Sequence, residues 1–342
     1  MLAARFYGGK DIRVEEVPDP VPGPGEVLVR VRAAGICGSD LHGYRRGGPA
    51  TAPRTPGHEL AGEVVSLGEG VSGFSSGDRV GVEPLVGCGQ CAHCRAGDYH
   101  LCPALEHIGG ARPGGFAQLT VAPADRFYPV PDHVSMEDAS ILDVLAVAVH
   151  ALSRVPVLPG ERVAVIGSGA IGLSIAQMAA ISGGAVAVLG RREGPLRVAA
   201  ETADAAGIRL DDDPVAAVRE WSGGEGADVV FEAVGGSADT LDLALRLAAP
   251  KGRVGVVGSF QEPQTLDVRV PMRRELSLLW VWSYALRGSR PEFAVALDLL
   301  ARGALKAAPL ITHRFPLERI AEGFAVADDK TAGNSIKVIV NP

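Results

Sequence analysis

The chain has 342 residues, enough for about two domains. Its 47% hydrophobic and 21% charged residues are typical of a folded globular protein rather than a disordered one. The net charge of −7, without any run rich in Lys and Arg, argues against a nucleic-acid partner. We find no apolar stretch of the roughly 18 residues that span a membrane, and no apolar signal-peptide segment at the start. We therefore expect a cytoplasmic protein without a membrane partner.

The first part of the chain predicts a β-rich domain. Residues 1–130 are rich in Gly and Pro and contain short β-type runs, for example at 26–32, 62–67 and 78–82. Each run is bounded by turn residues such as PGPG or SSGD, which is the pattern of short strands joined by tight turns.

From Glu161 onward the pattern changes to alternating strands and helices. Short apolar runs, of the kind found in buried parallel strands, alternate with helical stretches. The apolar runs are 162–166, 185–189, 228–231 and 253–257. This alternation predicts a doubly wound α/β sheet of the Rossmann type. The last fifty residues, with a helix expected at 292–302 and a strand at 336–340, do not continue it.

A glycine-rich loop follows the first of these strands. Residues 167–172 read GSGAIG and open a helix, which is the context that a dinucleotide-binding GxGxxG motif requires. The first glycine permits the turn, the second lets a pyrophosphate approach the backbone, and the third allows helix–strand packing. In a chain with 44 glycines the alternative is a strand–turn–helix that binds nothing, but the flanking elements favour dinucleotide binding. The cofactor-binding candidates, which include two residues after later strands, are Gly167, Ser168, Gly169, Ala170, Ile171, Gly172, Val234 and Gly258.

The end of the second strand predicts which dinucleotide binds. NAD-binding proteins carry Asp or Glu there, which binds the ribose 2′-hydroxyl. This chain has Gly190, followed by Arg191 and Arg192. Guanidinium groups bind a phosphate, whereas a carboxylate repels it, so we predict NADP in preference to NAD. The alternative is that both arginines are simply solvated.

Four of the five cysteines form a compact cluster, Cys88-x2-Cys91-x2-Cys94-x7-Cys102. Four thiolates at this spacing can enclose a tetrahedral metal ion and leave no position for a substrate. We therefore predict a structural zinc site; an iron–sulfur cluster is the alternative metal centre. A disulfide framework is disfavoured, because such cysteines are usually spread more widely and the cytoplasm is reducing.

The fifth cysteine belongs to a second group of possible ligands. Cys37 lies in GICGSDLH, and His58 and Glu59 follow 21 and 22 residues later. A thiolate, an imidazole and a carboxylate make a plausible open zinc site, at which the ion can polarise a substrate oxygen. Taken singly, a lone cysteine is usually a small buried hydrophobe. Beside a dinucleotide loop, the combination predicts a catalytic zinc.

Many motifs along the chain resemble, in the same order, those of the zinc-containing medium-chain alcohol and polyol dehydrogenases. The matching stretches read PGPGEVLVRV, AAGICGSDLH, PGHELAGEV, GDRVGVEP, the cysteine loop ending in DYHLC, GSGAIG, ADVVFEAVG, PLITHRFPL and KVIV. Glu83 and Pro84 before the cysteine loop, and Tyr99-x-Leu-Cys102 at its end, are typical of the sorbitol, idonate and threonine dehydrogenase branch.

The resemblance implies a fold and a domain division. A GroES-like β-barrel catalytic domain is expected over residues 1–150, completed by 291–342, with a Rossmann domain over 151–290. It also implies pairing of Rossmann domains into homodimers, often paired again into homotetramers.

The resemblance further implies the ligands of the catalytic zinc, which are Cys37, His58, Glu59 and a carboxylate at Asp143. The family usually has Glu where this chain has Asp143, so that residue binds zinc directly or through a water. Asp40 is expected to orient His58. With the four-cysteine site, two Zn²⁺ ions per chain are predicted.

By the same resemblance we expect hydride transfer between a secondary alcohol (a polyol, sugar acid, cyclitol or similar compound) or its ketone and NADP. Ser39 and His42 have the spacing of the family's proton relay, and a structural hydrogen-bonding role is their alternative. Tyr44, Trp280 and Tyr284 match substrate-pocket positions of the polyol branch, although the usual arginine is Ser283 here and the tryptophans can instead belong to an interface. A zinc-free enone reductase and a non-enzymatic zinc-stabilised binding protein are the alternative functions.

Overall fold

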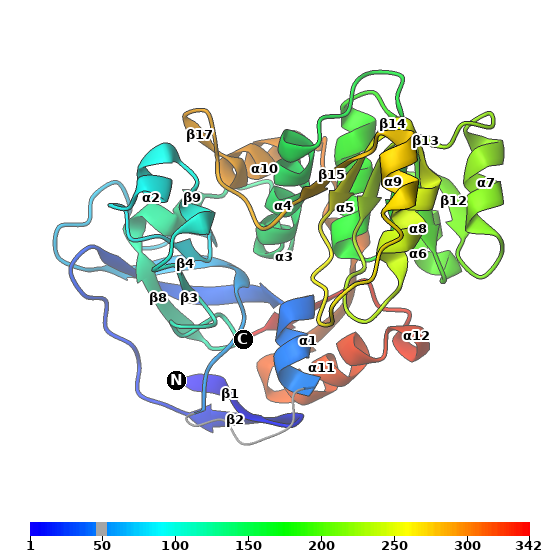
Figure 1. The fold of residues 1–342 in the computed structure, drawn as a ribbon. Coiled ribbons are helices and arrows are strands. Elements are labelled where there is room, and N and C mark those ends of the chain that lie inside the picture. The colour runs from blue at the N-terminus through cyan, green and yellow to red at the C-terminus, as the bar shows by residue number, and fades with distance from the viewer. Residues whose placement is uncertain (46–52) are drawn as a thin grey trace. The chain divides into compact units, whose positions relative to one another are not determined.

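The computed structural model describes residues 1–45 and 53–342, which form two compact units (Figure 1). The first unit comprises Met1–Asp143, Ala285–Gly303 and Ile311–Pro342, and the second comprises Val144–Tyr284 and Ala304–Leu310. The sequence predicts that all of 291–342 returns to the first domain, whereas residues 304–310 belong to the second unit. The side-chain amide of Gln177, in the second unit, binds this segment through hydrogen bonds of 2.7 and 3.2 Å with the backbone N–H and C=O of Lys306.

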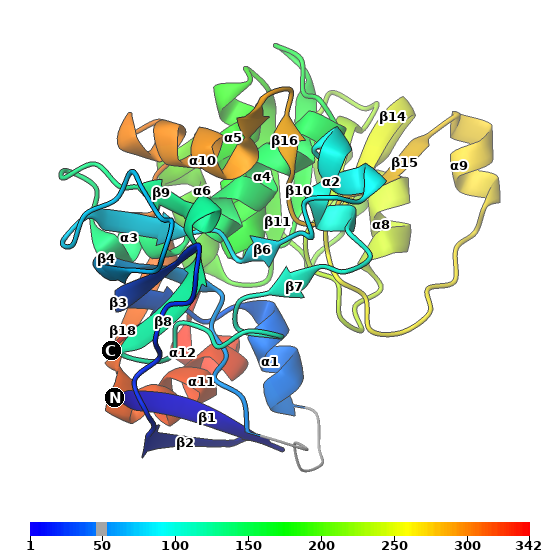
Figure 2. The same ribbon diagram turned by 90° about the vertical axis from the view of Figure 1, so that its left-hand side faces the viewer.

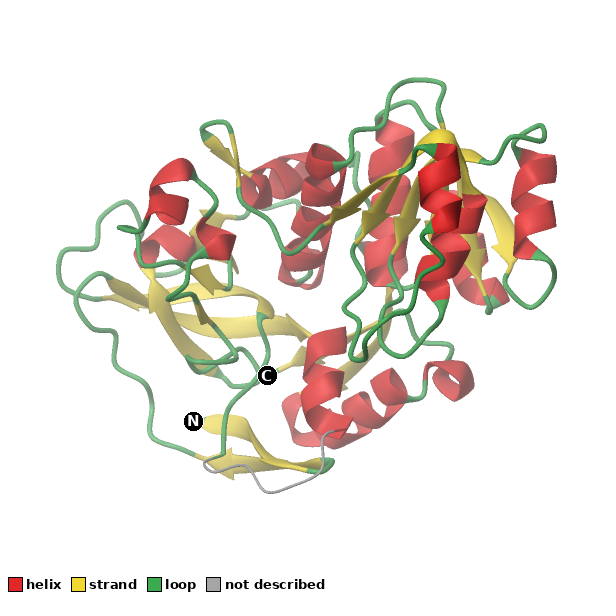
Figure 3. Ribbon diagram, viewed as in Figure 1, coloured by secondary structure: helices red, strands yellow, loops and turns green. Residues whose placement is uncertain are grey.

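The first unit is built on a mainly antiparallel seven-stranded sheet, drawn in yellow in Figure 3. The strand order is β18-β19-β3-β4-β5-β9, and β8 also pairs with β3. Side chains from these strands and from α1 and α11 enclose the core. The strands of the sheet are β3 (Glu26–Gly35), β4 (Glu59–Leu67), β5 (Arg79–Val82), β8 (Leu119–Pro123), β9 (Phe127–Pro129), β18 (Ile311–Pro316) and β19 (Lys337–Asn341).

The C-terminal strands β18 and β19 explain why the last fifty residues break the strand–helix alternation. They pair in parallel with each other, and β19 pairs antiparallel with β3, placing Ile339 opposite Gly35. The end of the chain therefore completes the sheet that its beginning forms, and it brings Lys337 beside the residues that follow β3.

Short elements surround this sheet. A hairpin of β1 (Leu2–Gly8) and β2 (Asp11–Glu16) begins the chain. The other strand pairs are β6 (Leu85–Val86) with β7 (Glu106–His107), and β16 (Leu286–Arg287) with β17 (Arg290–Pro291). The helices are α1 (Gly38–Arg45), α2 (Ala92–Ala96), α3 (Met136–Ser140), α10 (Glu292–Ala301), α11 (Ile320–Asp328) and α12 (Lys330–Gly333), with 3₁₀ turns at Tyr99–Leu101, Ala124–Arg126 and Leu317–Arg319.

The second unit is a parallel six-stranded sheet in the order β12-β11-β10-β13-β14-β15. This is the doubly wound order that the sequence predicts, with β10 at the centre, where the winding direction reverses. The strands are β10 (Arg162–Ile166), β11 (Ala185–Gly190), β12 (Ala206–Arg209), β13 (Ala227–Glu232), β14 (Ala248–Val256) and β15 (Ser277–Trp280).

Helices pack on both faces of this parallel sheet (Figure 2). Helices α5 and α6 contact each other over β10, β11 and β12, while α7 and α8 contact each other over the other face, as right-handed crossovers require. The helices are α4 (Leu142–Arg154), α5 (Ala170–Ile181), α6 (Glu193–Ala203), α7 (Pro214–Trp221), α8 (Thr240–Leu247) and α9 (Arg269–Arg274), with a 3₁₀ turn at Ala308–Leu310. Helix α4 starts at the boundary between the units. Within residues 1–45 and 53–342, every helix is too short or too polar to cross a bilayer.

Candidate active site and metal centres

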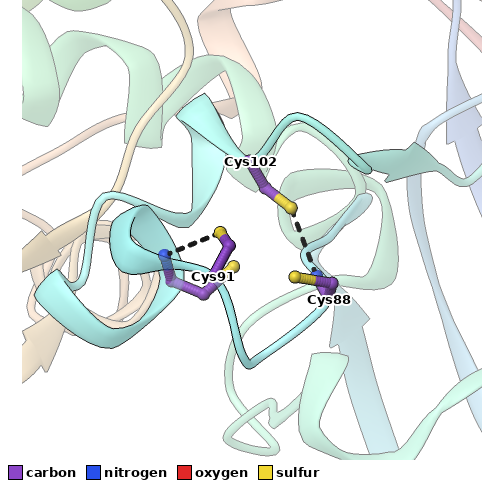
Figure 4. A group of neighbouring side chains, drawn as sticks. Cys88, Cys91 and Cys102 are labelled. Carbon is purple, nitrogen blue, oxygen red and sulfur yellow. Dashed lines mark hydrogen bonds between the residues drawn. The ribbon is translucent and has the colours of Figure 1, made fainter.

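The four cysteines predicted to bind structural zinc converge in the loop between β6 and β7 (Figure 4). Their sulfur atoms all lie within 4.8 Å of one another, and all five cysteines of the chain are free thiols rather than disulfides. Sulfurs bound tetrahedrally to zinc at about 2.3 Å lie about 3.8 Å apart, so the loop needs little adjustment to enclose the ion.

Local backbone geometry holds these sulfurs. Cys91 is the N-cap of α2 and its Sγ accepts a hydrogen bond from the N–H of Cys94 at 3.4 Å. The Sγ of Cys102 accepts one from the N–H of Cys88 at the same distance. Gly97 ends α2 with a φ of 88°, the left-handed conformation that glycine adopts without strain, and so turns the chain back toward Cys102.

The charges of the loop also suit a cation. Backbone N–H groups of Gln90 and Cys91 lower the pKa of the Cys88 thiol to about 6. Burial raises the pKa of the Cys94 thiol to about 12. The protein alone therefore stabilises the thiolate of Cys88 and disfavours ionisation of the Cys94 thiol. A bound cation would allow all four sulfurs to ionise.

The second predicted group of ligands assembles around the end of β3. Cys37 follows β3 and precedes α1, His58 lies just before β4, and Glu59 is the first residue of β4. One ligand atom from each lies within 4.8 Å of the other two. The antiparallel pairing of Gly35 with Glu59 brings the two segments together. Gly35 is required for this packing, because a Cβ there would lie 2.1 Å from Oε2 of Glu59.

Glu59 also has a partner that the sequence did not predict. Both of its carboxylate oxygens accept hydrogen bonds from Nζ of Lys337 at 2.7 Å, and Lys337 also donates to the carbonyl of Ile36. Glu59 is 0% exposed and Lys337 4%. Burial lowers the pKa of Lys337, but Glu59 and the nearby Cys37 outweigh it and raise the pKa overall. Glu59 therefore neutralises a buried ammonium here, and a metal would have to compete for its oxygens.

The electrostatics around His58 favour a cation. Burial by itself lowers the pKa of His58, yet Cys37, Asp40 and Asp143 outweigh burial and raise it well above its usual value. The same three groups that stabilise the protonated imidazole would also stabilise a metal ion bound to the imidazole in place of the proton. The donor set and its charge thus fit zinc.

Two carboxylates flank the imidazole of His58. Oδ1 of Asp40 lies 3.7 Å from Nδ1, and Oδ2 of Asp143 lies 4.0 Å from Nε2. Asp40 also accepts a hydrogen bond of 2.9 Å from the N–H of Cys37, and its burial raises the pKa of the carboxyl. Asp40 therefore faces the histidine that it was expected to orient. Asp143 lies near the cluster but outside the group of three ligands.

A further histidine lies next to this cluster. The ring of His107, on β7, meets the ring of His58 edge to face, with 4.9 Å between centroids. Burial and the neighbouring His58 lower the pKa of His107 to about 4, so it is neutral at physiological pH. His107 lies outside the matching stretches, and Lys337 begins the KVIV stretch, which gave no sign of a role at this site. The pairing of β6 with β7 and of β19 with β3 places both residues here.

The predicted site residues on α1 lie on two different sides of the helix. Asp40, Leu41 and Tyr44 point inward, whereas Ser39 is exposed and His42 is half-buried, three residues apart on one side of the helix.

The three predicted substrate-pocket residues have different surroundings, each described here within its own unit. Tyr44 is 7% exposed and packs in the core against Phe6 and Phe324, with ring centroids 6.2 and 5.2 Å away. Tyr284 is fully buried. Trp280 is 61% exposed on β15, the edge strand of the parallel sheet. Within the described residues, the ring of Tyr44 is part of the core of the first unit.

The glycine loop has the geometry that its motif predicts. Gly167 adopts a φ of 110°, and Gly172 approaches it so closely that a Cβ would lie 1.8 Å from the Gly167 carbonyl oxygen. A Cβ on Gly169 would meet no heavy atom within 4 Å in the described part of the chain, which leaves room for a pyrophosphate beside the start of α5. The loop lies at the carboxyl end of β10, the switch point of the sheet, where dinucleotides bind.

A buried carboxylate that the sequence did not predict supports the neighbouring candidate positions. Oε1 of Glu232, at the end of β13, accepts hydrogen bonds from the N–H groups of Val234 and Gly235 and from the Thr240 hydroxyl, at 2.8, 3.0 and 2.8 Å. A Cβ on Gly258 would lie 2.3 Å from its other oxygen. Val234 and Gly258 therefore meet around Glu232, on one side of the glycine loop.

The fold and these sites define a zinc-dependent, dinucleotide-binding oxidoreductase. The family model described as the alcohol dehydrogenase GroES-like domain matches residues 23–132, and the zinc-binding dehydrogenase model matches 170–302. Sorbitol dehydrogenase from Halalkalibacterium halodurans is 32% identical over 100% of this chain and 98% of its own length. The chain belongs to the zinc-type medium-chain alcohol and polyol dehydrogenase family, and it is an enzyme of that class. The family and the two-domain fold predicted from the sequence are confirmed.

Solved structures agree closely with this fold. A putative zinc-binding dehydrogenase from Sinorhizobium meliloti 1021 bound to NADP superposes with a TM-score of 0.89 at 32% identity, covering 100% of this chain and 99% of its own. An alcohol dehydrogenase from Escherichia coli CFT073 complexed with NADH gives a TM-score of 0.89 at 29% identity with the same coverage. Similar folds thus carry either dinucleotide.

Proposed function

We propose that this enzyme interconverts a secondary alcohol of the polyol type and its ketone, with NADP as hydride acceptor and donor. The observation that carries the proposal is the convergence of Cys37, His58 and Glu59 within 4.8 Å in a chain with an intact dinucleotide loop. The sorbitol dehydrogenase relative supports a polyol as the substrate class.

We assign one zinc to the four cysteines and a second to Cys37 and His58, with a carboxylate from Glu59 or Asp143. Zinc supplies a Lewis acid to a substrate oxygen when bound. Asp40 orients His58 from the opposite side, because its carboxylate faces Nδ1 and is itself held by the N–H of Cys37. Lys337 restrains Glu59, so Glu59 reaches a metal only by exchanging one cationic partner for another.

Oxidation of an alcohol releases a proton, and α1 offers it a route. Ser39 and His42 occupy one side of the helix, adjacent to Cys37 in sequence. A serine hydroxyl can accept and donate a proton at the same time, and an imidazole titrates near neutral pH. We assign Ser39 as the first acceptor and His42 as the group that exchanges with solvent.

The preference for NADP rests on the end of β11. Gly190 contributes no carboxylate, and Arg191 and Arg192 follow it, with Arg191 exposed to solvent. Burial lowers the pKa of Arg192, but an arginine stays charged, so it remains able to bind a phosphate. The NADP-bound relative supports this assignment, and the NADH-bound one shows that the fold alone does not decide it.

The test measures nicotinamide reduction with sorbitol, xylitol and 2,3-butanediol, using NADP⁺ and NAD⁺ in parallel, together with zinc per chain. We expect two zinc ions per chain, turnover of at least one alcohol, and a lower Kd for NADP⁺ than for NAD⁺. The Cys37→Ser variant should keep one zinc and the dinucleotide Kd but lose about 100-fold or more in kcat/KM. A two-zinc protein that oxidises none of these alcohols, or a Cys37→Ser variant with wild-type turnover, would overturn the proposal.

We also propose that the chain forms a homodimer or homotetramer. Strand β15 is an open edge of the parallel sheet, and Trp280 on it and Trp282 just after it are 61% and 56% exposed. Large exposed aromatic side chains at the edge strand of a sheet are typical of an interface. Light scattering on the purified protein tests this, and a monomeric mass at micromolar concentration would contradict it.

A further inference from the structure

The residue that ends β11 lies directly against the glycine loop. A Cβ built on Gly190 would lie 2.4 Å from Oγ of Ser168, 2.9 Å from its Cβ, and 3.2 Å from Cδ2 of Leu196. Ser168 and Leu196 are both buried, at 8% and 7% exposure. The space in which any side chain at residue 190 would begin is therefore occupied.

Glycine is present at residue 190 for space and not for backbone freedom. The φ of Gly190 lies outside the positive range that favours glycine, whereas that of Gly167 in the adjacent loop lies within it. An L-amino acid could adopt the backbone of Gly190 without strain. Only its side chain is excluded.

The surroundings have little freedom to make room. Gly190 is in register with Arg209 on β12, and its carbonyl accepts a hydrogen bond from the N–H of Leu210 at 3.1 Å. The preceding carbonyl, of Leu189, accepts one of 2.9 Å from the N–H of Gly167. Rotation of the Ser168 side chain would move its hydroxyl, but its Cβ is fixed to the loop backbone and would stay 2.9 Å away.

This packing bears on the choice of dinucleotide, because an acidic side chain at the end of this strand is what recognises the 2′-hydroxyl of NAD. We propose that Ser168 is a specificity-determining residue for the dinucleotide. With Leu196 it fills the space that an acidic side chain at residue 190 would need, and so keeps the strand end free of negative charge. The inference rests on the proposed preference for NADP and adds a steric barrier to the attraction of Arg191 and Arg192.

The proposal predicts that residues 168 and 190 are energetically coupled. Gly190→Ala introduces a Cβ without a charge and should lower the melting temperature of the dinucleotide-free protein by several degrees. Ser168→Gly removes both opposing atoms, and the Ser168→Gly/Gly190→Ala double variant should recover most of that loss. The Ser168→Gly single variant completes the double-mutant cycle. It measures how much stability the loop loses from a fourth glycine alone, so that this loss can be separated from the coupling. Ser168→Ala retains the Cβ and should rescue less than Ser168→Gly.

Dinucleotide binding provides the second measurement. Gly190→Asp alone should bind NAD⁺ and NADP⁺ poorly, whereas Ser168→Gly/Gly190→Asp should bind NAD⁺ about tenfold more tightly than the Gly190→Asp single variant. The proposal is overturned if Gly190→Ala melts like the wild type, or if Gly190→Asp gains NAD⁺ affinity without a change at residue 168. A wild-type enzyme that prefers NAD⁺ would refute the proposed NADP preference, yet the thermal coupling would remain measurable, so the two failures are distinguishable.

Discussion

The two clusters of donor atoms in the first unit have different origins. The four-cysteine cluster comes from residues 88–102, and neighbouring backbone N–H groups hold its sulfurs. The Cys37 cluster takes residues from segments as far apart as Cys37 and Lys337, and only the pairing of β3 with β4 and β19 brings them together. A local cluster depends on the conformation of one loop, whereas the second depends on the whole sheet.

The clusters also differ in how their charge is balanced. The four sulfurs accept hydrogen bonds from neighbouring backbone N–H groups and hydrogen-bond with one another, and a bound cation would supply the counter-charge for their thiolates. In the Cys37 cluster, Lys337 already neutralises Glu59, and carboxylates flank His58 on both sides. The first cluster thus resembles a site built to keep its metal permanently, and the second a site whose ligands are balanced against other charges.

The largest expected effect comes from breaking the local cluster. Cys94→Ala should lose one zinc per chain and lower the melting temperature by about 5–10 °C, because structural zinc contributes directly to folding. Differential scanning calorimetry with elemental analysis measures both quantities. Cys37→Ala is the matched control, which should lose the other zinc and melt close to the wild type. Equal thermal losses in the two variants would contradict the proposed difference between the clusters.

A loss of stability of similar size is expected from removing the buried ammonium of the second cluster. Lys337→Met leaves the carboxylate of Glu59 buried without its cation, and such a change costs about 3–5 kcal/mol of unfolding free energy. Denaturant unfolding of the metal-free protein measures it. The Glu59→Gln/Lys337→Met double variant removes both charges and should recover most of the stability. If the single variant is as stable as the wild type, the ion pair contributes no net stability.

The smallest effect is expected at Asp40, which contacts His58 without belonging to the group of three ligands. Asp40→Asn should weaken zinc binding at the Cys37 cluster by about 10–100-fold and leave the four-cysteine site unchanged. Competition with a zinc chelator, followed by counting the zinc that remains on each variant, separates the two sites. Asp138→Asn, a change in a half-buried first-turn residue of α3, is the control. Unchanged zinc retention in Asp40→Asn would exclude the orienting role.

Particular residues show where sequence reasoning succeeded and where it stopped. The glycine loop was readable because its function depends on three glycines in one turn, and the structure gives each the space that the motif implies. Tyr44 was assigned to a pocket by its position after a motif, but the turn of α1 directs it into the core beside Phe6 and Phe324. Position in a motif does not determine which side of a helix faces the core.

The sequence by itself determined the family, the Rossmann-type alternation, the glycine loop and the four-cysteine cluster, because each depends on residues close together in the chain. Only the tertiary structure showed that Lys337 holds Glu59, that His107 lies beside His58, and that Ser168 closes the space at Gly190. These contacts join residues that are up to 278 positions apart. Strand pairing and side-chain packing decide them, and neither leaves a local pattern in the sequence.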